Sequence, residues 1–188
     1  MSAPDDLREA APGLYVLASV AVPDDRADDV RQTLRSGLRH KRARFHWHDE
    51  QEGDRQAMAK LAADLQLSSL VAVSTPIDPK RPERARRACL TRLLWELEQW
   101  AVLDVVFESR QNRDRADRAH IVRAQKARHV SAWLTYGFAL PLQEPLLWLP
   151  DLVAGAVAHA RIGHVTSDSA KAGRPMCLGR SRPHFRPA

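Results

Sequence analysis

The chain has 188 residues, which is enough to bury a core as one domain without disulfides or a structural metal. Its two cysteines argue against a disulfide scaffold, and the lack of an apolar run of about 18 residues or of an apolar segment near Met1 argues against a membrane span or a secretory signal. We therefore expect a cytoplasmic protein. Basic residues exceed acidic ones by 29 to 23, but five of the six net charges lie after Asp168, at Lys171, Arg174, Arg180, Arg182 and Arg186. Because the remaining body is nearly neutral, the basic pI is weak evidence for nucleic-acid binding.

The predicted elements alternate between strands and helices. Residues 14–22 are apolar and partly β-branched, which is typical of a strand covered on both faces. The helix predicted over 24–38 places Val30, Leu34 and Leu38 on one stripe. The later elements, in order, are a weak strand over 42–48, a helix over 53–65, a strand over 70–74 that Pro76 closes, a helix over 82–100, a strand over 102–109, a helix over 113–128, a strand over 133–140 and a helix over 147–162. This order predicts an α/β fold with a mostly parallel sheet and helices on both faces.

Composition separates a folded domain, residues 1–163, from a tail, residues 164–188. The tail is rich in Ser, Gly, Pro and Arg and poor in apolar residues, so we expect it to be disordered.

The stretch VLDVVFESR, residues 102–110, carries candidate chemistry. Alternation along a strand places Asp104, Val106 and Glu108 on one face. Glu108 falls at the carboxyl end of the strand, where ligands of open α/β sheets bind. Arg110 follows and can pair with Glu108 or with a phosphate. The plainer interpretation is a strand that ends in a solvated, ion-paired glutamate.

The stretch LLWLPDLVAGAVAHA, residues 146–160, opens a nearly uncharged helix. Pro150 suits the first helical position, and Asp151 then lies in the first turn, where the helix dipole favours an anion. The small residues after Asp151 would let the helix lie close against the sheet. Asp151 is therefore either an ordinary first-turn acid or an acid that faces a site.

Two further groups are weaker candidates. In RFHWHDE, residues 44–50, strand alternation would place His46 and His48 on one face, as a metal pair requires, but no third ligand follows at a telling spacing. Packing or surface histidines are the more common case, with Trp47 in the core. Near the N-terminus, Asp5 and Asp6 form an acidic pair of the kind that is usually solvated.

Together these segments resemble a bacterial domain-of-unknown-function family, number 3800, with a ribonuclease H-like fold. The similar stretches are APGLYVLASVAV (11–22), FHWHDE (45–50), the helix around Arg86, Arg87 and Cys89, VVFESR with the charged run after it (105–118), and EPLLWLPDLVAGAV (144–157). The resemblance covers about residues 5–160. It implies a mixed, mostly parallel sheet flanked by helices.

The resemblance also implies a metal-dependent phosphodiesterase that acts on nucleic acid. Two Mg²⁺ or Mn²⁺ ions would be held by Glu108, Asp151 and one of Asp5 or Asp6, and Arg110 would steady a phosphate. Family members begin with a strand that reads like Asp-Glu-Ser, whereas Pro4 stands here where the leading Asp belongs. We therefore expect either a start placed too far downstream or a decayed site with poor or no cleavage.

Two alternatives to a nuclease stay open. One is a non-catalytic descendant of the same fold that binds nucleic acid or a protein partner. The other is a small-molecule enzyme on a doubly wound sheet.

Overall fold

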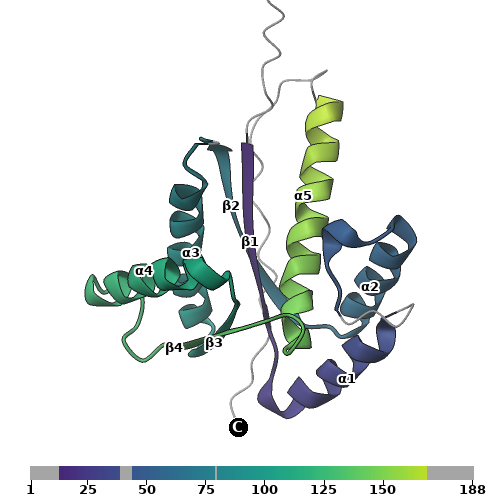
Figure 1. The fold of residues 1–188 in the computed structure, drawn as a ribbon, viewed down its shortest axis with the longest axis horizontal. Helices are drawn as coiled ribbons and strands as arrows, with labels where there is room; N and C mark the ends of the chain where they lie inside the picture. The colour runs from purple at the N-terminus through teal and green to yellow at the C-terminus, as the bar shows by residue number, and fades with distance from the viewer. Residues whose placement is uncertain (1–12, 39–43, 79, 169–188) are drawn as a thin grey trace, which may run out of the picture. The chain divides into compact units, whose positions relative to one another are not determined.

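The computed structural model describes residues 13–38, 44–78 and 80–168. Its strands and α-helices, in chain order, are β1 (Gly13–Ala21), α1 (Ala27–Gly37), α2 (Glu52–Asp64), β2 (Ser68–Ile77), α3 (Pro82–Gln99), β3 (Asp104–Glu108), α4 (Asp114–Lys126), β4 (Thr135–Ala139) and α5 (Trp148–Asp168). Figure 1 shows these elements along the chain. Short 3₁₀ turns precede α1, α2, α4 and α5. The α/β class and most of the predicted elements are confirmed.

The strands pair differently from the prediction of one mostly parallel sheet. In the described residues they form two separate pairs, β1 with β2 and β3 with β4. Gly13 at the start of β1 lies beside Ile77 at the end of β2, so that pair is antiparallel. The pair β3–β4 is parallel, because the Thr135 amide donates to the Leu103 carbonyl at 2.7 Å, where both strands begin. A single helix, α4, connects β3 to β4, as a parallel pair requires. Two helices, α1 and α2, connect β1 to β2, and a connection of this length is compatible with either a parallel or an antiparallel pair.

Three local predictions need correction. In the described part of residues 42–48 there is no strand, since Trp47–Asp49 forms a 3₁₀ turn that places Trp47 in the core. The strand β2 continues through Pro76, which follows a cis peptide bond, so this proline does not close it. The residues of β1 were expected to be covered on both faces, but all are only partly buried.

The chain forms two compact units, and β1 and β2 have residues in both. The first unit comprises Met1–Ala18 and Val71–Phe138, and the second comprises Ser19–Leu70 and Ala139–Ala188. The first unit holds α3, β3 and α4 with nearly all of β4, and the second holds α1, α2 and α5.

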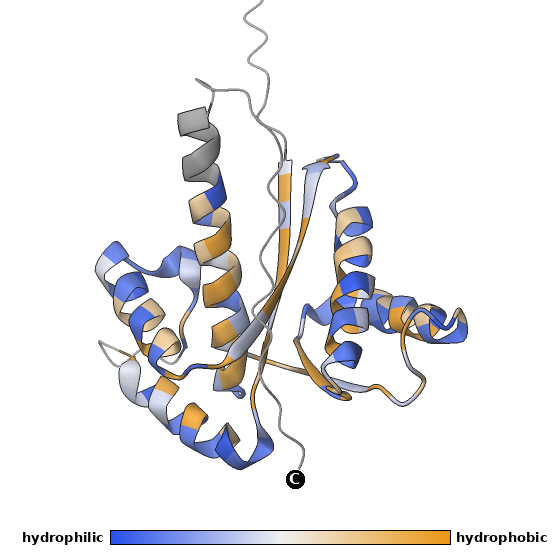
Figure 2. Cartoon of the chain, turned by 180° about the vertical axis from the view of Figure 1, so that it is seen from behind, coloured by the Kyte–Doolittle hydropathy of each residue, from blue (hydrophilic) through white to orange (hydrophobic). Residues whose placement is uncertain are grey.

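The core of the first unit lies where α3 packs against α4 (Figure 1). The predicted inward residues Leu90, Leu93, Leu94 and Leu97 of α3 are all buried, and Ile121 of α4 is fully buried. Both helices carry hydrophilic residues beside these apolar ones (Figure 2). A polar face of α3 is therefore left for other contacts.

The core of the second unit is a cluster of large side chains from α1, α2, α5 and the segment before α2. Its buried members are Val30, Leu34, Phe45, Trp47, Met58, Trp148, Leu149 and Leu152. Gly155 of α5 packs on the indole of Trp47, where a Cβ would lie 2.2 Å from a ring atom. Here the smallest residue of α5 makes room for a tryptophan, rather than for the sheet that the sequence suggested. In the described part of the chain, no helix is long and apolar enough to cross a membrane.

Candidate functional site

Glu108 lies where the sequence predicts. It is the last residue of β3, and the strand alternates as expected, with Asp104, Val106 and Glu108 exposed and Val105 and Phe107 partly buried. Glu108 is engaged with a partner, so it is not free.

Asp151 also lies where the sequence predicts, in the first turn of α5. Its Oδ2 atom accepts a hydrogen bond from the Trp47 amide at 2.8 Å and one from Nδ1 of His46 at 3.1 Å. Asp151 therefore ties α5 to the turn that carries the buried Trp47. The carboxylate is held in one orientation by groups more than 100 residues away, a contact that sequence reasoning missed.

The two histidines of RFHWHDE lie near each other, although not on a strand. Their ring centroids are 5.9 Å apart and the rings meet edge to face. His46 directs Nδ1 to Asp151, and His48 is exposed.

The carboxylates predicted to share metal ions are distributed over the chain. Glu108 belongs to the first unit and Asp151 to the second, while Asp5 and Asp6 lie outside the described residues. Within residues 13–38, 44–78 and 80–168, no group of three or more His, Cys, Asp or Glu side chains could hold a metal ion. The described residues therefore do not fit a two-metal centre by themselves, and metal binding by Glu108 together with Asp151 stays a prediction.

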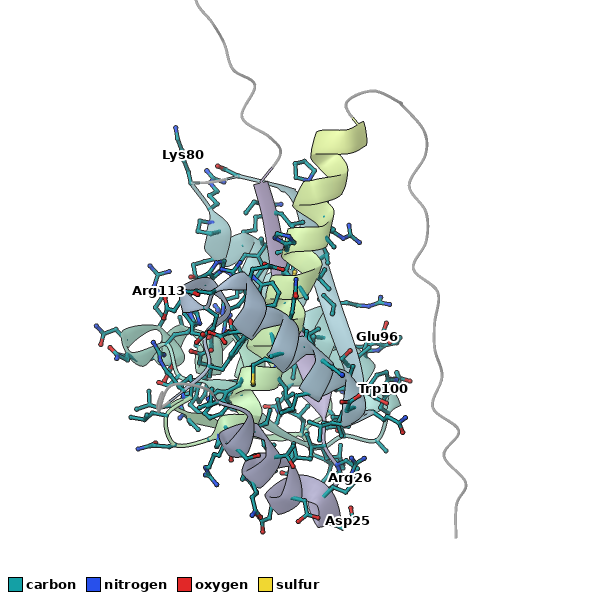
Figure 3. All side chains as sticks on the ribbon, turned by 90° about the vertical axis from the view of Figure 1, so that its right-hand side faces the viewer. Asp25, Arg26, Lys80, Glu96, Trp100 and Arg113 are labelled. Atoms are coloured by element: carbon teal, nitrogen blue, oxygen red, sulfur yellow. The ribbon has the colours of Figure 1, made fainter. Side chains whose placement is uncertain are left out.

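Arg110, the predicted phosphate ligand, is bound to carboxylates of its own unit. Its guanidinium forms ion pairs with Glu83 at the start of α3 and with Asp117 of α4. Arg113, labelled in Figure 3, also pairs with Glu83. The hydrogen bond from Arg110 is the largest influence on Glu83 and lowers the pKa of this carboxyl, with Arg113 acting in the same direction. Arg110 therefore ties α3 to α4.

Arg86 is the buried centre of the same network. Its Nε donates to both carboxylate oxygens of Asp117, at 3.0 and 3.2 Å, its Nη2 donates to Oδ2 of Asp117 at 2.7 Å, and its Nη1 donates to the Tyr15 hydroxyl at 3.2 Å. Burial alone lowers the pKa of Arg86, but the hydrogen bonds that Arg86 donates to Asp117 and Tyr15 outweigh it and raise this pKa. Arg86 therefore keeps its positive charge, and the carboxylate of Asp117 balances this charge.

A basic groove of about 600 Å³, open to solvent, lies on the polar face of α3 in the same unit. We call it the α3–α4 groove, and it is lined by Arg87, Ala88, Thr91, Arg92, Trp95, His120, Arg128 and His129. The first five are spaced so that they share one face of α3. His120 comes from α4, and Arg128 and His129 follow its end. None of the lining residues is acidic, although Glu96, labelled in Figure 3, pairs with Arg92 beside the groove.

The end of α4 positions two of the groove residues. The amide of His129 donates to the Ala124 carbonyl and that of Arg128 to the Gln125 carbonyl, which is the Schellman pattern of a helix end. Arg128 takes the left-handed position, with φ 57°, that glycine usually occupies there. An arginine in this position is strained, so its side chain is kept in the groove at a cost in stability.

The groove histidine His120 lies against α3, and its surroundings lower its pKa. Its Nε2 lies 2.8 Å from Thr91 Oγ1 and 3.1 Å from the Arg87 carbonyl. Burial lowers the pKa of His120, and the charges of Arg123 and Arg87 lower it further. The lining residues that carry a permanent charge are its three arginines, of which Arg92 is paired with Glu96.

Comparison of the chain with protein-family models, with curated proteins and with solved structures finds no match.

The groove is the part of the site that sequence reasoning missed. The leucines of α3 predict its buried face, and the groove lies on the opposite face of the same helix. The spacing of Arg87, Thr91 and Trp95, each four residues after the last, was the available signal, because it aligns a cation, a hydroxyl and an indole on one helix face.

Proposed function

We propose that this protein binds nucleic acid through the α3–α4 groove, which corresponds to the non-catalytic alternative of the sequence analysis. The observation that carries the proposal is the charge of the groove. Arg87, Arg92 and Arg128 line it, and no acidic side chain does. Arginine guanidinium groups bind phosphate oxygens through paired hydrogen bonds, and Thr91 and the imidazoles add neutral partners.

The shape of the groove favours a polymer over a small anion. It is open to solvent and runs along more than two turns of α3, from Arg87 to Trp95. Separate arginines along such a groove match successive phosphates of one strand. The five basic residues after Asp168 would add affinity that does not depend on sequence and falls with salt.

The test is to replace Arg87, Arg92 and Arg128 together by alanine and to measure oligonucleotide binding across salt concentrations. We expect the affinity to fall at least tenfold. We also expect the dependence of log K on log salt to flatten by about two, because each lost phosphate contact on a single strand removes about 0.7.

The matched control removes the same charge elsewhere. Lys60, Arg115 and Lys126 are exposed and do not line the groove, so their replacement by alanine should change affinity less than threefold. Equal loss in both triple variants would contradict a role for the groove.

We also propose a ribonuclease H-like fold, supported by the parallel unit β3–α4–β4. Metal-dependent cleavage of nucleic acid with Glu108 and Asp151 as ligands would follow from that fold only if carboxylates outside the described residues complete the centre, because no group of three or more His, Cys, Asp or Glu side chains within them could hold a metal ion. A cleavage assay with Mg²⁺ or Mn²⁺ separates it from binding alone.

A further inference from the structure

We propose that the nucleic acid in the α3–α4 groove is single-stranded and that one of its bases stacks on Trp95. This inference rests on the proposed function and names the strand state of its ligand. It starts from an unusual lining residue. Trp95 is 40% exposed although its side chain is the largest in the groove.

The indole of Trp95 is held beside a cation. The guanidinium carbon of Arg92 lies 4.9 Å from the ring centroid, and Arg92 is in turn paired with Glu96 one helical turn further on. Stacking of this kind restrains both side chains before any ligand arrives. A base that stacks against the pair meets an aromatic surface and a planar cation together, while its phosphates reach Arg87 and Arg128.

The strand state follows from which surfaces a ligand can offer. In a duplex the base faces are stacked inside the helix, so an aromatic side chain of the protein reaches only phosphates, sugars and base edges. A single strand offers base faces as well, and stacking of one base on an aromatic side chain adds about 5- to 150-fold to affinity. Among nucleic acids, an exposed indole among three arginines therefore adds stacking affinity for a single strand and not for a duplex.

An acidic protein segment is the other ligand that three arginines would attract. It has carboxylates for the guanidinium groups but no planar base for Trp95. A nucleic-acid strand without bases separates charge from stacking in the same way, because it keeps every phosphate and has no base to stack on Trp95.

The experiment measures binding of the full chain to four labelled probes by fluorescence anisotropy at one salt concentration. The probes are a 12-nucleotide oligo-dT, an abasic strand of the same length, a duplex of the same length and a poly-glutamate of equal charge. We expect oligo-dT to bind at least tenfold tighter than each of the others, and to quench tryptophan fluorescence.

Three variants assign the effect to one side chain. Trp95→Ala should reduce oligo-dT binding to the level of the abasic strand, and Trp95→Phe should keep most of the preference because it keeps an aromatic face. Trp133→Ala is the matched control, since Trp133 is 81% exposed and does not line the groove, and it should leave binding unchanged. Circular dichroism of each variant confirms that it is folded.

Two results overturn the inference, and they differ from failure of the proposed function. If oligo-dT, the abasic strand and the duplex bind equally, or if Trp95→Ala keeps the full preference, stacking is wrong while phosphate binding in the groove stands. If poly-glutamate binds best, or if the triple arginine variant binds every oligonucleotide like the unaltered chain, the proposed function itself is wrong.

Discussion

At the scale of the residue, Arg128 combines a structural cost with a candidate function. Its φ of 57° at the end of α4 is a conformation that glycine adopts freely and that side chains with a Cβ adopt at a cost. Glycine would be the usual choice at this position of a Schellman helix end. The Arg128 side chain lines the α3–α4 groove, so the same residue has a strained backbone and a proposed contact with the ligand.

This combination predicts opposite effects on stability and binding. Arg128→Gly should leave the free energy of unfolding unchanged or raise it by up to about 1 kcal/mol, because relief of strain exceeds the entropy that glycine adds to the unfolded chain. The same change should weaken oligonucleotide binding several-fold. Urea denaturation and anisotropy titration measure the two effects, and Arg128→Ala should weaken binding equally without the gain in stability. A loss of stability in the glycine variant would contradict this account.

At the scale of the element, α3 and α4 are joined by leucines and also by a buried ion pair. The side chains of Arg86 and Asp117 are only 10% and 4% exposed, and Tyr15 of β1 supplies a further partner within the same unit. Neither helix pattern reveals this contact, since an Arg and an Asp that lie 31 residues apart look like ordinary surface residues. The Arg86–Asp117 pair joins α3 to α4. It therefore helps to position His120 of α4 against Thr91 and Arg87 of α3.

Removing one member of this pair should be costly. Asp117→Asn leaves the charge of Arg86 buried and unmatched, and should lower the free energy of unfolding by about 3–5 kcal/mol. Replacing both residues, as Arg86→Met with Asp117→Leu, should recover much of that loss, because no charge is then buried. The matched control is Glu52→Gln, which removes the charge of an exposed glutamate that pairs with the partly buried Arg55 at 3.9 Å, and it should cost less than about 1 kcal/mol. Equal losses in Asp117→Asn and Glu52→Gln would show that burial of the pair does not matter.

At the scale of the whole molecule, cleavage depends on residues from separate parts of the chain. Glu108 lies in the first unit, Asp151 in the second, and Asp5 and Asp6 lie outside the described residues. A two-metal mechanism needs at least three carboxylates in register, because its catalysis comes from positioned charge.

We therefore expect poor cleavage or none. The assay combines the purified full chain with single- and double-stranded DNA and RNA in Mg²⁺ or Mn²⁺. Glu108→Ala and Asp151→Ala serve as the paired variants. Robust cleavage that both substitutions abolish would show that the carboxylates do assemble, and replacement of Asp5 and Asp6 would then identify the third ligand.

Patterns in the sequence are enough to place most of the elements in order, the inward leucines of α3, the alternation of β3, and Glu108 and Asp151 at the ends of their elements. These features follow from patterns within a few consecutive residues, which a helix or strand displays wherever it lies. Only the tertiary structure decided that the strands form two pairs, that Asp151 holds His46 and the Trp47 amide, that Arg110 is bound to Glu83 and Asp117, and that Arg87, His120 and Arg128 line one groove. Those contacts join residues far apart in the chain, and packing selects them from many partners with equally suitable chemistry.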